Sequence, residues 1–139
     1  MDLGQKRMQV TGGVMKAMKV LFVCTGNVAR SPMAAEIFRE LAGPDAAHAA
    51  RAVGTAAWAV RRLTTRDLAW ADVVAVMEPR HLVEIRRHWP DHAGKVRVLG
   101  VLDDYDPGEP ELRDLLTSRV QALLAELDLP RAPRRPRKA

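Results

Sequence analysis

The chain has 139 residues, with 47% hydrophobic and 28% charged side chains and a formal net charge of +5. This composition is typical of one globular domain and excludes a disordered, fibrous or collagen-like chain. No run of about 18 uncharged apolar residues is present, so we expect neither a membrane-spanning segment nor a membrane partner. The single cysteine, Cys24, excludes an internal disulfide framework and a zinc site made of several cysteines.

The positive charge is concentrated at the two ends of the chain. Residues 131–139 contribute +5 and residues 1–17 contribute +2, so residues 18–130 carry −2. We therefore predict a flexible leader over 1–17, a folded domain over 18–128 and a disordered basic Pro/Arg tail over 129–139. Such a tail is more typical of a solvated end than of a nucleic-acid site, so we expect no nucleic-acid partner. The lone cysteine and the lack of a secretory signal favour a cytoplasmic location.

The first predicted elements are a strand, a loop and a helix. The apolar run Val20–Val23 is typical of a strand that is buried on both faces. A polar loop with a Gly-Asn turn signal follows over 24–30. Ser31 is a favoured N-cap and Pro32 suits the first helical position, so a helix is predicted to begin there. The Gly43-Pro44 pair is predicted to end it.

The remaining elements alternate strands with helices. A short strand is predicted around Arg51–Val53 and a buried strand over Asp72–Met77. A helix opened by Pro79 precedes a fourth strand at Val96–Leu99, and a long amphipathic helix spans Glu109–Leu127. This alternation predicts an α/β fold, a flavodoxin-like three-layer sandwich with a four-stranded parallel sheet.

The loop after the first strand carries the candidate chemistry. Cys24 stands at the carboxyl end of that strand, the edge where open α/β sheets bind ligands. The following helix N-terminus favours a thiolate and can hold a phosphate or another oxyanion. Arg30 suits two phosphate oxygens, Gly26 permits a tight path, and Asn27 tolerates a left-handed conformation. Ser31 can donate to the thiolate or cap the helix, although a structural buried cysteine is the alternative.

The stretch VLFVCTGNVARSPMAAEIF resembles the C-x-G-N-x-x-R-S-P motif of the low-molecular-weight protein tyrosine phosphatase family. The segments 51–55 and 70–78 are similar to strands of that family, and the resemblance covers about residues 18–128. The segment between Thr55 and Leu68 is shorter than the family's usual substrate loop and second helix. The chain therefore resembles a shortened, phosphatase-like branch.

The resemblance implies a phosphatase that needs no cofactor and no metal. The Cys24 thiolate would attack phosphorus, and water would hydrolyse the resulting phosphocysteine. Asn27 would brace the loop, and Ser31 would assist departure of the thiolate. The residues expected to bind phosphate, through backbone N–H groups and the Arg30 guanidinium, are Thr25, Gly26, Asn27, Val28, Ala29 and Arg30.

The same resemblance implies a general acid in the loop before the last helix. The family uses an Asp in an Asp-Pro-aromatic motif, and this chain has Asp103-Asp104-Tyr105 followed by Asp106-Pro107. Register favours Asp103, because Tyr105 then takes the place of the family's aromatic residue; Asp106 and Asp104 are the alternatives. Tyr105 and Trp58 are the candidates to stack on a phenyl ring of the substrate.

The expected partners are a phosphorylated protein or small aryl phosphate, and inorganic phosphate or another oxyanion. Two other functions stay open: an arsenate reductase that uses an external thiol, and a non-catalytic phosphate-binding or phosphopeptide-binding protein. The four histidines show no metal-ligand spacing, and we expect each to be solvent-exposed. They are His48, His81, His88 and His92.

Overall fold

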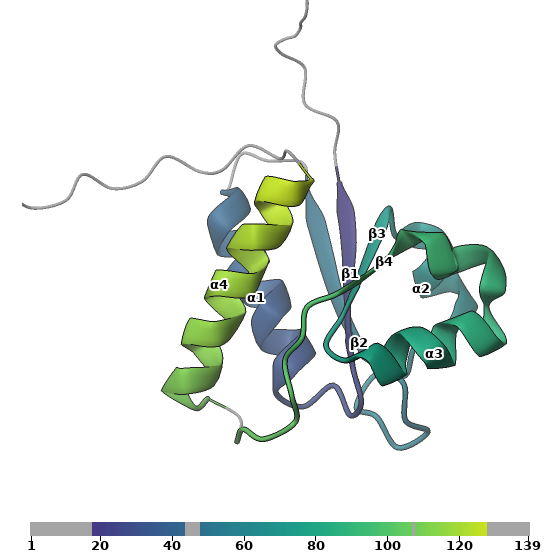
Figure 1. Ribbon diagram of the computed structural model, residues 1–139, viewed down its shortest axis with the longest axis horizontal. Coiled ribbons are helices and arrows are strands. Elements are labelled where there is room, and N and C mark those ends of the chain that lie inside the picture. Colours follow the sequence, from purple (N-terminus) through teal and green to yellow (C-terminus); the bar gives the residue numbers. More distant parts are fainter. Residues whose placement is uncertain (1–17, 44–47, 107, 128–139) are drawn as a thin grey trace, which may run out of the picture.

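The computed structural model describes residues 18–43, 48–106 and 108–127. Its four strands form one parallel sheet in the order β2-β1-β3-β4. Helices α1 and α4 cover one face of this sheet, and α2 and α3 cover the other (Figure 1). The strands are β1 (Lys19–Cys24), β2 (Ala49–Gly54), β3 (Val73–Val76) and β4 (Val96–Val98). The helices are α1 (Arg30–Ala42), α2 (Thr65–Trp70), α3 (Pro79–His88) and α4 (Pro110–Glu126), with a 3-10 turn η1 (Pro90–Lys95).

This arrangement confirms the predicted three-layer sandwich and its four parallel strands. The predicted leader over 1–17 and tail over 129–139 lie outside the described residues. No helix of the described part of the chain is long and apolar enough to cross a membrane.

Two local features differ from the sequence-based predictions. Helix α1 begins at Arg30 with Ala29 as its N-cap, so Ser31 is not the cap. The Ser31 hydroxyl instead contacts the loop, as described below. Helix α2 was not predicted; a capping box between Thr64 and Asp67 stabilises its first turn.

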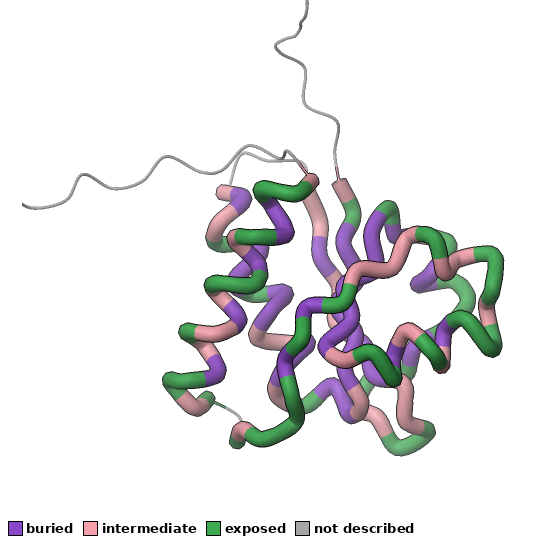
Figure 2. Tube along the Cα trace, in the orientation of Figure 1, coloured by how far each residue is buried: buried purple, intermediate pink, exposed green. Residues whose placement is uncertain are grey.

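The two central strands, β1 and β3, are buried on both faces, as their continuous apolar runs predict (Figure 2). Side chains of β1 alternate between two clusters, because successive residues of a strand point to opposite faces. Val20, Phe22 and Cys24 belong to the cluster under α1 and α4, whereas Leu21 and Val23 belong to the cluster under α2 and α3.

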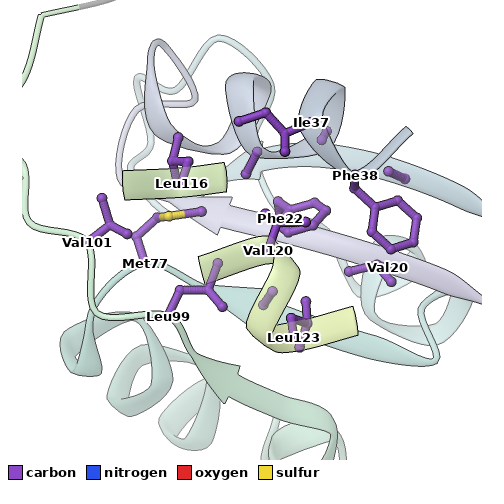
Figure 3. Close-up of a cluster of buried hydrophobic side chains, with 14 of the residues drawn as sticks. Val20, Phe22, Ile37, Phe38, Met77, Leu99, Val101, Leu116, Val120 and Leu123 are labelled. Atoms are coloured by element: carbon purple, nitrogen blue, oxygen red, sulfur yellow. The ribbon is translucent and has the colours of Figure 1, made fainter. Parts of the chain in front are cut away.

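The cluster under α1 and α4 is built around aromatic and branched side chains (Figure 3). The rings of Phe22 and Phe38 lie 5.9 Å apart between centroids in a tilted contact. Leu116 and Val120 of α4 lie over the same strand, and all four side chains are fully buried. This packing holds α1 and α4 against the sheet.

Candidate active site

The loop over residues 24–30, called the 24–30 loop below, turns back on its own first side chain. Asn27 has a φ of 55°, the left-handed conformation that the sequence analysis expected it to tolerate. That conformation directs the Asn27 N–H to the Cys24 Sγ at 3.2 Å. The sulfur therefore sits inside a turn of backbone, at the N-terminus of α1.

Ser31 joins the sulfur to the rest of the loop. Its Oγ lies 3.0 Å from the Cys24 Sγ and donates to the Asn27 Oδ1 at 2.7 Å. The Val53 carbonyl, 3.2 Å away, is a third possible acceptor for the same hydroxyl hydrogen. Because a hydroxyl rotates freely about its C–O bond, Ser31 can turn its hydrogen to the sulfur when that sulfur carries a negative charge.

Arg30 is held from outside the loop, although its side chain is only 3% exposed. Its Nη1 donates to Glu78 Oε2 at 2.6 Å and to the Val101 carbonyl at 2.9 Å. Both Nη1 hydrogens are thus used, which leaves Nε and Nη2 to meet an oxyanion. Although burial raises the pKa of Glu78, the hydrogen bonds and charges of Arg30 and Arg80 bring it below its ordinary value. Glu78 is therefore a carboxylate at neutral pH.

A cavity of about 120 Å³ opens over Cys24 and Arg30. Asp103 lines it from the loop before α4, with its Oδ1 3.7 Å from Arg30 Nη2 and its side chain 62% exposed. Asp104 and Asp106 are exposed and do not line this cavity. The other lining residues are Gly26, Val28, Ala29, Trp58 and Tyr105. The predicted nucleophile, arginine, acid and both aromatic candidates thus meet at one place.

The short segment between β2 and α2 supports the loop through its backbone. Three of its N–H groups donate to consecutive carbonyls of the loop region at 3.0 Å, in the pairs Thr55 to Cys24, Ala56 to Thr25 and Val60 to Gly26. Glycine is required at position 54 for this close approach, because a Cβ there would lie 2.5 Å from the Thr25 carbonyl oxygen.

Two residues of the site were missed by the sequence analysis. Glu78, which holds Arg30, precedes α3 and carried no motif. His81 was predicted to be solvent-exposed, and that prediction is wrong: the side chain is 2% exposed, with Nε2 3.0 Å from Thr25 Oγ1. Burial, with the charge of Arg30, lowers the pKa of His81 to about 4. His48 and His92 are half-buried, and only His88 is exposed as predicted.

The described residues contain no group of three or more His, Cys, Asp or Glu side chains that could hold a metal ion. A second hollow, of about 240 Å³, lies between the segment after β2 and helix α3. Its lining includes Arg62, Glu84 and His88 but neither Cys24 nor Arg30. The 24–30 loop is therefore the site with a complete set of groups for anion chemistry.

Comparison with known proteins gives matches in sequence. A family model described as low molecular weight phosphotyrosine protein phosphatase matches residues 19–57, which include the whole 24–30 loop. A low molecular weight protein-tyrosine-phosphatase from Streptomyces coelicolor is 32% identical over 117 residues, which cover 64% of this chain and 70% of the relative.

Solved structures also match. The YwlE arginine phosphatase from Geobacillus stearothermophilus has a TM-score of 0.65 and 26% identity, over 80% of this chain and 93% of its own. The tyrosine phosphatase Wzb from Escherichia coli K30, solved with phosphate, has a TM-score of 0.68 at 21% identity, over 81% of this chain and 99% of its own. Both likenesses support the α/β sandwich described above.

Proposed function

This chain belongs to the low molecular weight protein tyrosine phosphatase family and is a cysteine-dependent phosphatase, and from that premise we propose that it removes phosphate from phosphotyrosine in proteins. The observation that carries the proposal is the meeting of Cys24, Arg30 and Asp103 around one cavity of about 120 Å³. These residues offer a nucleophile, an oxyanion-binding group and an acid, which are the three functions that cleavage of a phosphomonoester needs.

In the first step, the Cys24 thiolate attacks phosphorus in line with the ester oxygen. An S–P bond forms and the P–O ester bond breaks, while the Asp103 carboxylic acid gives its proton to the leaving oxygen. Arg30 Nε and Nη2, together with the backbone N–H groups of the 24–30 loop, bind the three equatorial oxygens. Glu78 supports this step because it occupies Nη1 and keeps the guanidinium facing the loop.

In the second step, water hydrolyses the phosphocysteine. The Asp103 carboxylate takes a proton from the attacking water, a P–O bond forms, and the S–P bond breaks. Ser31 stabilises the departing thiolate, because its Oγ lies 3.0 Å from the sulfur and its hydrogen can turn toward it. The products are inorganic phosphate and the free thiolate.

The walls of the cavity favour an aromatic leaving group. Trp58, 71% exposed, and Val28, 55% exposed, present apolar surface at the mouth, and Tyr105 lines the same cavity. A phenyl ring can pack between such side chains, whereas a short alkyl group gains less contact. Phosphotyrosine is therefore the substrate that these walls fit best.

Phosphoarginine is the second candidate substrate. The YwlE relative, which is 26% identical, is an arginine phosphatase, and the exposed carboxylates of Asp103, Asp104 and Asp106 stand in one loop beside the cavity. Such carboxylates attract a guanidinium. A peptide with phosphotyrosine and the same peptide with phosphoarginine separate the two; a higher kcat/KM for phosphoarginine would contradict the tyrosine assignment.

Turnover of 4-nitrophenyl phosphate tests the nucleophile and the acid together. We expect Cys24→Ser to lose turnover by about 10⁴-fold or more, and Asp103→Asn by about 100-fold. Asp104→Asn is the matched control, since its side chain lies outside the cavity, and it should stay within about twofold of the wild type. If Asp104→Asn loses turnover while Asp103→Asn keeps it, Asp104 and not Asp103 is the general acid.

The same preparation tests the two other functions. Tight phosphate binding without any Cys24-dependent turnover identifies a binding protein and ends the phosphatase proposal. Arsenate-dependent oxidation of added glutathione, faster than phosphate release, identifies a reductase that uses an external thiol. We expect neither result.

A further inference from the structure

The start of α3 contacts the 24–30 loop at both of its ends. Glu78 Oε2 accepts from Arg30 Nη1 at 2.6 Å, at the end of the loop. His81 Nε2 lies 3.0 Å from Thr25 Oγ1, at its beginning. The two contacts are joined, because the Glu78 backbone N–H donates to His81 Nδ1 at 3.0 Å. One continuous hydrogen-bonded chain therefore runs from Arg30 through Glu78 and His81 to Thr25.

The direction of each hydrogen bond in this chain follows from chemistry. A backbone N–H is always a donor, so His81 Nδ1 must be the acceptor and carries no hydrogen. In a neutral imidazole the hydrogen then sits on Nε2. His81 Nε2 therefore donates to Thr25 Oγ1, and the Thr25 hydroxyl acts as an acceptor.

His81 keeps this role across the ordinary pH range. Its side chain is 2% exposed, and the groups that act on it electrostatically are Arg30, Glu78, Arg80 and Asp103. Burial and the nearby guanidinium groups lower its pKa to about 4, so the ring is neutral above about pH 5. A second hydrogen, on Nδ1, would face the Glu78 N–H and break the chain of hydrogen bonds.

We propose that His81 is a positioning residue for phosphoryl transfer: through Thr25 it fixes the first peptide units of the 24–30 loop, while Glu78 fixes Arg30. Thr25 is then held on two sides, because its carbonyl also accepts the Ala56 N–H at 3.0 Å. The inference rests on the proposed function, since it assumes that the N–H groups of this loop bind the transferring phosphoryl group.

A purely structural role makes a different prediction. If His81 only capped α3, its bond to the Glu78 N–H would be sufficient, and the Thr25 hydroxyl would contribute to stability alone. If His81 positions the loop, loss of the Thr25 hydroxyl weakens oxyanion binding and slows turnover even in fully folded protein. The inhibition constant of inorganic phosphate therefore distinguishes the two roles, because it measures oxyanion binding by the loop.

The test compares Thr25→Val, Thr25→Ser and His81→Asn in the full chain. Val keeps the shape of Thr without the acceptor, Ser keeps the acceptor, and Asn keeps an acceptor near the Glu78 N–H but is too short for Thr25. We expect Thr25→Val and His81→Asn each to lower kcat/KM for 4-nitrophenyl phosphate about five- to tenfold and to weaken phosphate inhibition similarly. Thr25→Ser should stay within about twofold of the wild type.

The double variant and a distant control complete the test. Because Thr25 and His81 act through one hydrogen bond, the double variant should lose no more than the more severe single variant. Thr65→Val is the matched control: Thr65 Oγ1 accepts from Trp89 Nε1 at 2.9 Å and neither residue lines the cavity over Cys24, so its loss should leave kcat/KM unchanged. The proposal is overturned if the double variant shows the product of the two single losses in kcat/KM. It is also overturned if the phosphate inhibition constant of Thr25→Val is unchanged.

A measurement on the wild-type protein tests the state of the His81 ring without relying on the folding of any variant. The ¹⁵N chemical shifts of the His81 imidazole should report a neutral ring with hydrogen on Nε2 at pH 7, and inorganic phosphate should shift the Nε2–H resonance. A ring with hydrogen on Nδ1 overturns the proposal. Wild-type turnover that does not depend on Cys24 contradicts the proposed function instead, so the two failures are distinguishable.

Discussion

The two faces of the sheet are built differently. Among the residues that the structure describes, α1 and α4, with 13 and 17 residues, bury a cluster of 19, whereas α2 and α3, with 6 and 10 residues, bury a cluster of 9. Asp67 and His81, both 2% exposed, belong to the helices of the smaller face, whereas the buried polar side chains of α1, Arg30 and Ser31, stand at its start. The larger face thus supplies most of the apolar burial, and the smaller face adds the polar side chains that hold the 24–30 loop from outside it.

This difference suggests a division of roles between the faces. Apolar packing is tolerant of direction, so it can stabilise the sheet without fixing an atom to within a few tenths of an ångström. Hydrogen bonds to the 24–30 loop are directional, and the side-chain contacts from Glu78 and His81 come from the smaller face. Substitutions in the apolar cluster of the larger face should therefore change stability, and substitutions of the polar side chains that contact the 24–30 loop from the smaller face should change catalysis.

The largest effect is expected from a truncation on the larger face. Phe38→Ala removes a fully buried ring that contacts Phe22, so it should lower the free energy of unfolding by about 3–5 kcal/mol. Denaturation in urea measures this loss. The kcat of the fraction that stays folded should match the wild type within about twofold; a larger fall in kcat would break the division of roles.

The next effect is a loss of stability in acid that depends on His81. An unfolded histidine has a pKa near 6.5, and burial lowers that of His81 to about 4. Between these values the unfolded chain binds a proton that the folded chain does not, so stability falls as the pH falls from 6.5 to 4. The full contribution is about 3 kcal/mol. The free energy of unfolding should therefore be measured at pH 7 and at pH 4.5 for both proteins. The difference between the two pH values should be smaller in His81→Asn than in the wild type.

The third effect concerns the partner of Arg30. Glu78→Ala leaves the buried guanidinium without its carboxylate, so we expect kcat/KM for an aryl phosphate to fall by about 100-fold. Glu78→Gln keeps an acceptor of the same shape and should lose about tenfold. Glu84→Ala, which removes a half-buried carboxylate of α3 that pairs with His88, is the control and should retain full activity. Equal losses in Glu78→Gln and Glu84→Ala would contradict the assigned role.

The smallest effect is expected at the wall of the cavity. Buried Asp67 accepts from Arg61 Nη2 at 2.9 Å, and the Arg61 carbonyl accepts the Gly54 N–H, so Asp67 anchors the segment that carries Trp58. Asp67→Asn should raise KM for an aryl phosphate about two- to fivefold, with kcat little changed, at a cost in stability of about 1–2 kcal/mol. Steady-state kinetics separate KM from kcat. A fall in kcat with an unchanged KM would show that Asp67 does not act through the wall.

The strands and the loop could be predicted from sequence because their signals are local. A strand buried on both faces reads as a continuous apolar run, and the loop motif lies within nine consecutive residues from Cys24 to Pro32. Helix α2 was missed because six residues are too few to show a helical period. The Thr64 and Asp67 pair, with the spacing of a capping box, was the one signal that could have indicated it.

The supporting residues of the site could not be predicted because their partners are distant in sequence. His81 and Thr25 are separated by 56 positions, and Glu78 and Arg30 by 48. Without the sheet order, a histidine that lacks metal-ligand spacing is predicted to be solvent-exposed. The parallel pairing of β1 with β3 is what brings the start of α3 beside the loop after β1. Asp103, in contrast, was singled out by its register with Tyr105, and it lines the cavity.

Cys24 is the only cysteine of the 139 residues. When peroxide oxidises a nucleophilic sulfur to a sulfenic acid, a neighbouring thiol can capture it as a disulfide and so prevent the irreversible step to sulfinic acid. This sequence offers no such neighbour, so disulfide capture of the oxidised sulfur depends on external thiols such as glutathione. Recovery by that route is therefore set by the thiol pool around the protein and not by a second residue of the chain.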